Sequence, residues 1–240
     1  MKDIRTYLFI IIMCSISALT LSVVSTALKP TQIHAQNSYK NAELLKAADL
    51  LPKTATYKQI QEISEKELTP MLTDDQGNIF TFAEKNLDLN TYLEKGETTG
   101  YATMPLKLFY QVKGGKVILP VNGFGLWDAI YGFIGIEKNG FTITGISWYS
   151  QKETPGLGGE IQNPKWQKNF KGKSIFHGKK LETFGLQFIP IQMLALLPPQ
   201  DQDYSIDAIS GATITTDGVQ NAIKNSLSPY IPLLRTMQKR

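Results

Sequence analysis

Cysteine and histidine are almost absent from this chain. Cys14 is the only cysteine, and His34 and His177 are the only histidines among 240 residues. A single cysteine inside an apolar run excludes a disulfide, a zinc–cysteine cluster or an iron–sulfur centre in the remaining chain. Two histidines so distant in sequence make a poor metal site, so we expect no metal. Ser–His and Cys–His nucleophilic chemistry also lacks its usual base.

A concentration of charge of one sign is missing as well. Twenty-five lysines and arginines face 21 acids, and the formal net charge is +4. The lysines are scattered, whereas a nucleic-acid-binding domain ordinarily carries a basic patch, so we expect no nucleic-acid partner. Hydrophobic content of 42% and charged content of 19% are ordinary for a globular protein. The length suffices for one large domain or two modest ones.

One long uncharged run stands at the N-terminus: "YLFIIIMCSISALTLSVVSTAL", residues 7–28. A helix of roughly 20 apolar residues crosses a bilayer. Lys2 and Arg5 precede the run against one acid, Asp3, which favours a cytoplasmic N-terminus and an exported remainder. The alternative is a signal peptide cleaved after Ala27. Because signal h-regions usually span about 7–15 residues, we favour a retained single-pass anchor.

The first part of the exported chain favours helix. Residues 29–42 are polar, contain Pro30 and show no clear periodicity, which indicates a linker. Apolar residues at helical spacing predict a helix over 41–51. A second helix is expected over 56–72, halted near Pro70.

From Gly100 onward the sequence favours strands. Residues 106–112 and 116–121 flank the compact turn "KGG" and predict a hairpin. Residues 131–137 and 141–149 flank "KNG", where Asn139-Gly140 is a strong hairpin signal because both residues tolerate positive φ.

These patterns predict an α+β protein: a single N-terminal transmembrane helix, then an exported domain with a largely antiparallel sheet and flanking helices. The expected divisions are a cytoplasmic N-terminus (1–6), a transmembrane helix (7–28), a linker (29–42), a small helical or α/β supporting segment (43–99) and a main domain (100–240).

The last predicted helix starts beside a loop of small residues. Residues 217–227 carry an apolar stripe, and Thr215, Thr216 and Asp217 are N-cap candidates. "SGAT", residues 210–213, then lies just before a helix N-terminus, where free N–H groups and the helix dipole favour a phosphate. Gly211 and Ala212 keep the approach open, and Ser210 and Thr213 present hydroxyls. A small-residue turn that caps a helix explains these four letters equally well.

Three stretches together carry a resemblance. "GFGLW" (123–127), "ETPGLGGE" (153–160) and "DAISGATIT" (207–215) follow an N-terminal anchor. In this order they resemble the FMN-binding domain family of the C subunit of the Na⁺-translocating NADH:quinone reductase, which is shared with the G subunit of the Rnf electron-transport complex. The resemblance runs from about Tyr101 to Gln220. "GLW" followed by "YGF" favours the first complex.

The resemblance implies a covalent flavin. In the family, FMN is joined through its phosphate to the hydroxyl of the last residue of a D-x-x-S/T-G-A-T motif, here Thr213, which makes the protein a flavoprotein and a phosphoprotein. A separate flavin transferase performs the attachment. Its recognition sequence corresponds to Asp207, Ser210, Gly211, Ala212 and Thr213. The residues agree, since a phosphoester needs an accessible hydroxyl at an anion-favouring helix start rather than a histidine base.

The same resemblance implies the remaining FMN contacts. Leu126 and Trp127 would cover part of the isoalloxazine, and Lys173 would face the phosphate or the N1/C2 carbonyl edge, although an ordinary surface lysine explains it nearly as well. Gln151 stands where relatives commonly carry histidine, which argues against proton handling there. The other expected contacts are Glu153, Thr154, Gly156, Leu157, Gly158, Ser210, Gly211 and Ala212.

The function implied is that of an electron-carrier subunit in the bacterial inner membrane. It would relay electrons between NADH and ubiquinone in a sodium-transporting complex, with the other subunits, the membrane and the transferase as partners. Its N-terminus would be cytoplasmic and its FMN domain periplasmic. The alternatives are the G subunit of an Rnf complex, a membrane-anchored hydrolase using Ser210 or Thr213, and a non-catalytic exported binding domain.

Overall fold

A computed structural model of the chain describes residues 2–177 and 183–238. It divides into two compact units, Met1–Lys40 and Asn41–Arg240, each described here by itself. Residues 1, 178–182 and 239–240, which belong to the expected N-terminal tail and main domain, lie outside the described residues.

The first unit is part of one long helix, α1 (Lys2–Ala47). An 18-residue window of α1 has a mean hydropathy of 2.4 and no buried residue, so this helix is long and apolar enough to cross a membrane. The helix expected over 7–28 is present. The linker expected over 29–42 is helical rather than irregular, although Pro30 lies inside it. Proline removes one N–H donor, and helix-forming neighbours on both sides carry the helix past it.

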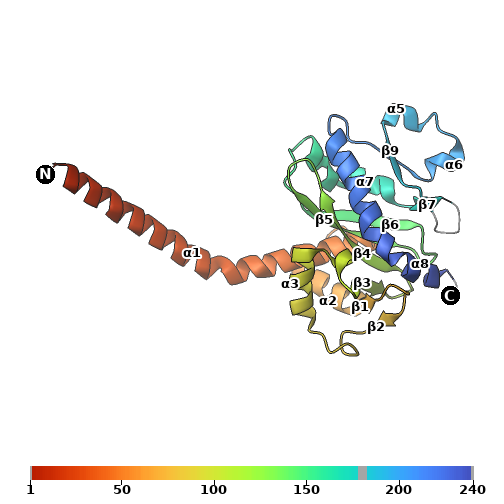
Figure 1. The fold of residues 1–240 in the computed structure, drawn as a ribbon, viewed down its shortest axis with the longest axis horizontal. Helices are drawn as coiled ribbons and strands as arrows, with labels where there is room; N and C mark the ends of the chain where they lie inside the picture. The colour runs from red at the N-terminus through yellow and green to blue at the C-terminus, as the bar shows by residue number, and fades with distance from the viewer. Residues whose placement is uncertain (1, 178–182, 239–240) are drawn as a thin grey trace. The chain divides into compact units, whose positions relative to one another are not determined.

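A six-stranded sheet forms the centre of the second unit (Figure 1). The strand order is β2-β1-β3-β4-β5-β6, and every neighbouring pair is antiparallel. The largely antiparallel sheet expected from the sequence is therefore confirmed. The strands are β1 (Leu68–Thr73), β2 (Ile79–Phe80), β3 (Lys107–Val112), β4 (Val117–Phe124), β5 (Ala129–Ile136) and β6 (Ile143–Ser150).

Both expected hairpins are present as β3–β4 and β5–β6. The β5–β6 turn differs in detail from the expectation of two positive φ angles. Only Gly140 adopts positive φ (+79°), while the Asn139 side chain accepts hydrogen bonds from the N–H groups of Phe141 (3.1 Å) and Thr142 (3.0 Å). The asparagine thus stabilises the turn through its side chain.

The segment expected to end a helix at Pro70 instead enters the sheet. Helix α2 (Tyr57–Glu67) starts at a capping box between Thr56 and Gln59 and stops at Glu67. Leu68 is extended, and β1 pairs with β3 along its whole length, with Pro70 opposite Tyr110. Through this pairing, residues 43–99 contribute helices and strands to the same compact unit as residues 100–238.

The sheet is covered on both faces, so its strands are buried on both sides. On one face Leu119 and Ile134 pack in one cluster with residues of α7 (Thr213–Leu227) and α8 (Ile231–Met237). On the other face Ile118 and Phe133 pack with the last turns of α1, with α2 and with α3 (Leu89–Thr99). Figure 1 shows α7 crossing the sheet.

The remaining elements follow β6, apart from one short 3₁₀ turn before β3. The helical ones are η1 (Tyr101–Thr103), η2 (Gly158–Gln162), α4 (Pro164–Gln167), η3 (Lys168–Phe170), α5 (Ile191–Leu194), α6 (Pro199–Gln202) and η4 (Ser228–Tyr230). The strands are β7 (Phe176–His177), β8 (Thr183–Phe184), β9 (Gln187–Ile189) and β10 (Ser205–Asp207). β9 and β10 pair in parallel, so their C-terminal ends lie at the same end of this two-stranded sheet.

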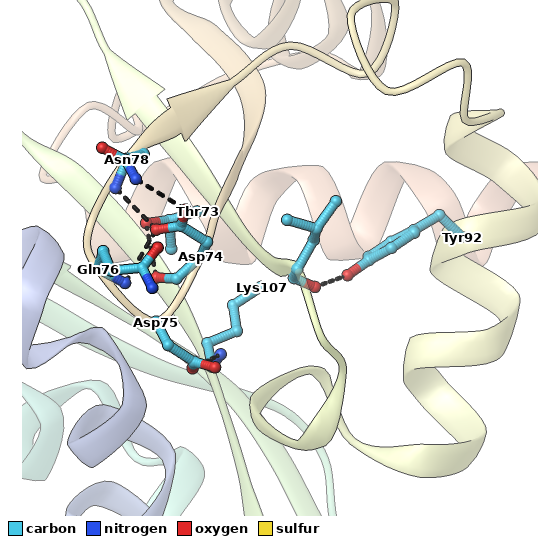
Figure 2. A network of polar contacts seen from close by, with 8 residues as sticks. Thr73, Asp74, Asp75, Gln76, Asn78, Tyr92 and Lys107 are labelled. Carbon is cyan, nitrogen blue, oxygen red and sulfur yellow. Dashed lines mark hydrogen bonds and ion pairs between the residues drawn. The ribbon is translucent and has the colours of Figure 1, made fainter.

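A polar network fixes the turn between β1 and β2 (Figure 2). One Asp74 carboxylate oxygen accepts the N–H groups of Gln76 and Asn78 at 2.9 Å each, and the Asn78 amide donates to the other oxygen at 2.8 Å. The Asn78 side chain is the main cause of a lowered Asp74 pKa. In the same view the buried Lys107 ammonium lies 2.5 Å from Asp75.

The C-terminal end of α1 packs closely against β5 and β6 where glycines leave room for it. Gly135 and Gly145 face each other in β5 and β6, and a Cβ on Gly135 would lie 2.1 Å from the Ala47 carbonyl oxygen. The Thr144 hydroxyl donates to that oxygen at 2.7 Å, and the Ser147 hydroxyl donates to the Glu43 carbonyl at 2.8 Å. The Ala47 carbonyl, which has no partner within the helix, thus receives a side-chain donor, and the Glu43 carbonyl receives a second one.

Replacing Thr144 by valine should destabilise the domain by about 1–3 kcal/mol, because the buried Ala47 carbonyl loses its donor while side-chain volume is kept. Chemical denaturation of the detergent-solubilised chain measures this. Thr69→Val, at an exposed position of β1, is the matched control and should stay within about 0.5 kcal/mol. Equal stability of both variants would contradict the role assigned to Thr144.

Candidate functional site

A hollow of about 240 Å³ lies where three loop segments meet. The β4–β5 turn, the glycine-rich loop after β6 and the start of α7 supply its walls. The lining residues are Leu126, Trp127, Glu153, Thr154, Leu157, Gly158, Gly211, Ala212, Thr213, Ile214 and Thr215. All three stretches that carry the family resemblance therefore converge on one place.

Helix α7 begins at Thr213, earlier than the sequence predicts. Thr215, Thr216 and Asp217 lie within the helix and are not its N-cap. Thr216 donates back to the Ala212 carbonyl at 2.9 Å, and Thr215 donates to a carboxylate of another loop. Ala212 holds the N-cap position, and no side chain among the described residues caps it. The first N–H groups of α7 are consequently free to bind an anion.

The carboxylate of Glu153 joins the three walls. One oxygen accepts the Trp127 N–H at 2.9 Å, and the other accepts the Leu126 N–H at 3.0 Å. The Thr215 hydroxyl donates to that second oxygen at 2.5 Å. Glu153 itself is only 5% exposed. A single buried side chain therefore fixes the β4–β5 turn and the helix start relative to the glycine-rich loop.

Glycines make room for this arrangement. A Cβ on Gly125 would lie 2.5 Å from a Glu153 carboxylate oxygen, and one on Gly158 would lie 2.5 Å from the Thr215 hydroxyl. Further along, a Cβ on Gly123 would lie 2.5 Å from that of Ala222. Side chains at these positions would separate the walls, so close approach requires glycine.

The Glu153 carboxyl is held in its charged form. Burial raises its pKa, but the Thr215 hydroxyl and the backbone N–H groups of the β4–β5 turn lower the pKa by more than burial raises it. The net result is a pKa below the ordinary value. Hydrogen bonds to the charged form thus outweigh desolvation.

The rim of the hollow is apolar and open to solvent. Trp127 is 69% exposed, and Leu126, Leu157 and Ile214 are also exposed. The Trp127 indole N–H donates to the Thr154 hydroxyl at 3.1 Å, which fixes the ring. Trp127 is therefore a surface residue with a fixed ring. An exposed aromatic and aliphatic rim suits a flat, partly apolar ligand.

The structure brings together most of the site residues that the sequence predicts. Gly211 has φ of +75°, a conformation that favours glycine, and Thr213 is exposed. The predicted residues found in the lining are Leu126, Trp127, Glu153, Thr154, Leu157, Gly158, Gly211, Ala212 and Thr213. Ile214 and Thr215 also line the hollow and are missed by sequence reasoning. The helical register of α7, starting at 213, is the signal that places them there.

Four predicted residues lie outside the lining. Gly156 and Ser210 are exposed on the neighbouring loops. The Lys173 ammonium donates to the Gln202 carbonyl at 2.6 Å, so it is engaged elsewhere. Burial raises the pKa of the Asp207 carboxyl. This carboxyl also accepts the Ile191 N–H, which connects the start of the "DAISGAT" stretch to α5.

Gln151, which replaces the histidine common in relatives, has a structural contact. Its side-chain oxygen accepts the Glu153 N–H, and its amide donates to Gln162 at 3.1 Å. The Gln162 amide donates in turn to the Trp148 carbonyl at 3.0 Å. Gln151 therefore holds the start of the glycine-rich loop through its side chain.

Within residues 2–177 and 183–238, no group of three or more His, Cys, Asp or Glu side chains is arranged to hold a metal ion. The His177 ring lies against the Tyr204 ring with centroids 4.2 Å apart, and neither residue lines the hollow.

Known proteins are similar to this chain over nearly its whole length. The C subunit of the Na(+)-translocating NADH-quinone reductase of Chlamydia muridarum is 34% identical, covering 95% of this chain and 90% of the relative. The same subunit of Pasteurella multocida is 32% identical, covering 91% and 87%. That of Neisseria meningitidis is 42% identical over a shorter stretch, 53% of this chain and 50% of the relative.

Solved structures share the fold. The crystal structure of the C subunit of the Na(+)-translocating NADH-quinone reductase from Parabacteroides distasonis has a TM-score of 0.66 and 25% identity, covering 86% of this chain and 96% of that chain. The crystal structure of Shewanella oneidensis NqrC has a TM-score of 0.66 and 23% identity, covering 85% and 98%. The second likeness concerns the fold alone.

Glu153→Gln should remove a pH-dependent part of the stability. A carboxyl whose pKa is lower in the folded than in the unfolded state stabilises fully above its unfolded pKa, about 4.3, and loses that contribution as the pH falls through the folded pKa. The variant should therefore lose about 1.5–3 kcal/mol at neutral pH and approach the wild type in acid.

Thermal unfolding of both proteins between neutral and acidic pH measures this difference. Glu62→Gln, an exposed carboxylate on α2, is the control and should stay within about 0.5 kcal/mol. A stability difference that does not change with pH would contradict the charge-dependent contribution of Glu153.

The family model of the FMN-binding domain matches residues 125–228. This range contains all three walls of the hollow, from Leu126 to Thr215. The similarity to the Chlamydia muridarum relative extends beyond it to almost the full length of both proteins. The chain belongs to the family of the C subunit of the Na(+)-translocating NADH-quinone reductase.

Proposed function

We propose that this chain is an electron-carrier subunit of a bacterial Na⁺-translocating NADH:quinone reductase, and that it carries FMN joined by a phosphoester to the Thr213 hydroxyl. The observation that carries the proposal is the position of Thr213. Its exposed hydroxyl stands on the first residue of α7, at the edge of the hollow. The family membership supports the same cofactor.

The start of α7 suits a phosphate. Free N–H groups and the positive end of the helix dipole favour an anion. Thr213 offers the oxygen for the ester at this point, and Gly211 and Ala212 add no bulky side chain. The phosphate would thus be held by the backbone and by one covalent bond. Ser210 and Asp207 would serve recognition by the flavin transferase.

The hollow suits part of an isoalloxazine ring. Its volume of about 240 Å³ is below the roughly 300–1,000 Å³ of pockets that enclose a ligand. Trp127, Leu126 and Leu157 offer apolar surface at its rim. A ring bound here would be covered on one side and accessible on the other. Accessibility suits a relay that exchanges electrons with neighbouring centres.

The chain's own residues would bind, orient and shield the flavin. FMN, when bound, supplies the electron-carrying chemistry, while the protein supplies position and electrostatics. The Glu153 carboxylate holds the β4–β5 turn through two N–H groups, and Thr154 fixes the Trp127 indole. A covalent bond removes dissociation of the cofactor, which in an exported domain would be lost to a dilute compartment.

The apolar part of α1 would anchor the protein in the inner membrane. Its length and hydropathy support a single crossing. Lys2 and Arg5 ahead of the apolar run favour a cytoplasmic N-terminus and a periplasmic FMN domain. The other subunits of the complex would be the partners of that domain.

A hydrolase has less support. It would need a base beside Ser210 or Thr213, but the Glu153 carboxylate is saturated by Leu126, Trp127 and Thr215. The G subunit of an Rnf complex would use the same local chemistry. The relatives that cover most of this chain carry the name of the C subunit of the Na(+)-translocating reductase, which favours that complex.

Thr213→Ala should abolish covalent flavin, because the ester oxygen is removed. With a flavin transferase co-expressed, the wild-type band should fluoresce after denaturing electrophoresis and the variant band should be dark. Mass mapping should place the modification on the peptide that contains Thr213. Thr216→Ser, which keeps a buried hydroxyl in the same helix turn, should still fluoresce. A modification that survives in Thr213→Ala would refute the attachment site.

The orientation of the anchor can be tested with single cysteines. After Cys14→Ser, a cysteine at exposed Lys58 should react with a membrane-impermeant maleimide in intact spheroplasts, since the domain should be outside. A cysteine replacing Lys2 should react only after lysis. Labelling in the reverse order would overturn the orientation.

A further inference from the structure

The buried carboxylate in the wall of the hollow has an electrostatic role. We propose that Glu153 is a positioning residue and a fixed negative charge that lowers the electron affinity of the flavin ring, an assignment that rests on the flavin function proposed above. It makes Glu153 a tuning group rather than a direct ligand of the ring.

The contacts of Glu153 leave little capacity for a ligand. Its two oxygens accept the Leu126 and Trp127 N–H groups at 3.0 and 2.9 Å and the Thr215 hydroxyl at 2.5 Å. The residue is 5% exposed. The donors come from two segments that lie far from Glu153 in the sequence. A carboxylate saturated in this way fixes its neighbours and remains immobile itself.

The surrounding backbone is shaped to admit the carboxylate. A Cβ on Gly125 would lie 2.5 Å from one carboxylate oxygen, and a Cβ on Gly158 would lie 2.8 Å from the other. Because Gly125 and Gly158 have no side chain, the main chain packs closely against both carboxylate oxygens. The site is therefore built for a carboxylate rather than filled by one incidentally.

The charge on Glu153 has no cationic partner in the part of the chain that the structure describes. Its neighbour in sequence, Lys152, pairs with Asp128 at 2.5 Å instead. Among the described residues, no lysine, arginine or histidine forms an ion pair with Glu153. The positive end of the α7 dipole and the three hydrogen bonds stabilise it. Since they also hold its pKa below the ordinary value, the negative charge persists at neutral pH.

A fixed negative charge beside a redox ring disfavours the reduced form. Adding an electron to the ring places a second negative charge near the first, and water screens the charge of the buried Glu153 carboxylate, which is 5% exposed, only weakly. Charges near a flavin are among the groups that set its electronics. Neutralising Glu153 should therefore make the ring easier to reduce.

The test compares flavin midpoint potentials in the full-length flavinylated chain. Glu153→Gln should shift the midpoint potential in the positive direction in a spectroelectrochemical titration. Asp128→Asn is the matched control, because it removes a carboxylate of the β4–β5 turn that is partly exposed and paired with Lys152, and it should cause a much smaller shift. An unchanged or more negative potential in Glu153→Gln, or an equal shift in both variants, would overturn the electrostatic assignment.

Two Thr215 variants test positioning independently, in case Glu153→Gln folds poorly. Thr215→Val keeps the shape but removes the donor to Glu153, and Thr215→Ser restores a hydroxyl. The valine variant should change the flavin absorption bands and lower the flavinylated fraction several-fold, and the serine variant should recover both. Valine and serine variants that both match the wild type would refute the positioning role.

These outcomes are separable from failure of the proposed function. If the wild-type chain carries no flavin on Thr213, the proposed function fails before any potential is measured. If the wild type is flavinylated and the Glu153 and Thr215 variants behave like it, the flavin assignment stands and the role of Glu153 fails.

Discussion

The hydrogen bonds to one buried carboxylate hold the candidate site together. Glu153 joins a β-turn and a helix start to the glycine-rich loop, whereas the Trp127–Thr154 hydrogen bond and the Lys152–Asp128 ion pair join only the turn to that loop. The sheet explains why this is possible. Its strands are buried on both faces, so β4 and α7 form a rigid base from which the turn and the helix start project. Glycines at 123, 125 and 158 allow the approach. Rigid support and a charged centre together give a hollow whose walls are preorganised.

The elements with strong local signals were predictable from the sequence. The apolar run gave a helix, and the turns "KGG" and "KNG" gave hairpins because glycine and asparagine adopt conformations that other residues avoid. The strand over 68–73 was missed because Pro70 favours a helix end, whereas six pairs with β3 decide the outcome. Helix α7 was started too late because its threonine hydroxyls bind other partners instead of capping. Long-range pairing overrode local preference in both places.

The sequence predicts which residues line the candidate site but not which contacts their side chains make. The motifs named nine of the eleven lining residues, since the family resemblance is carried by the same loops. Glu153 is expected from the resemblance as a polar contact of the flavin, a role that stays a prediction, and the structure adds its hydrogen bonds to Leu126, Trp127 and Thr215. The hydrogen bond between Glu153 and Thr215 joins residues that are 62 positions apart, and no local sequence pattern predicts such a pair. Lys173 is expected near the flavin from the family resemblance, whereas its ammonium donates to the Gln202 carbonyl of α6, outside the lining of the hollow.

The exposure of Thr213 bears on the order of biogenesis. Its hydroxyl is reachable on the surface of the completed fold, on the first residue of a helix whose hydrophobic stripe is already buried. If Thr213 carries the flavin as proposed above, a flavin transferase would be able to act on the folded domain, with no need for a partly unfolded substrate. Polypeptide that awaits its cofactor would then be a stable pool, protected from proteolysis by a core that does not depend on the flavin.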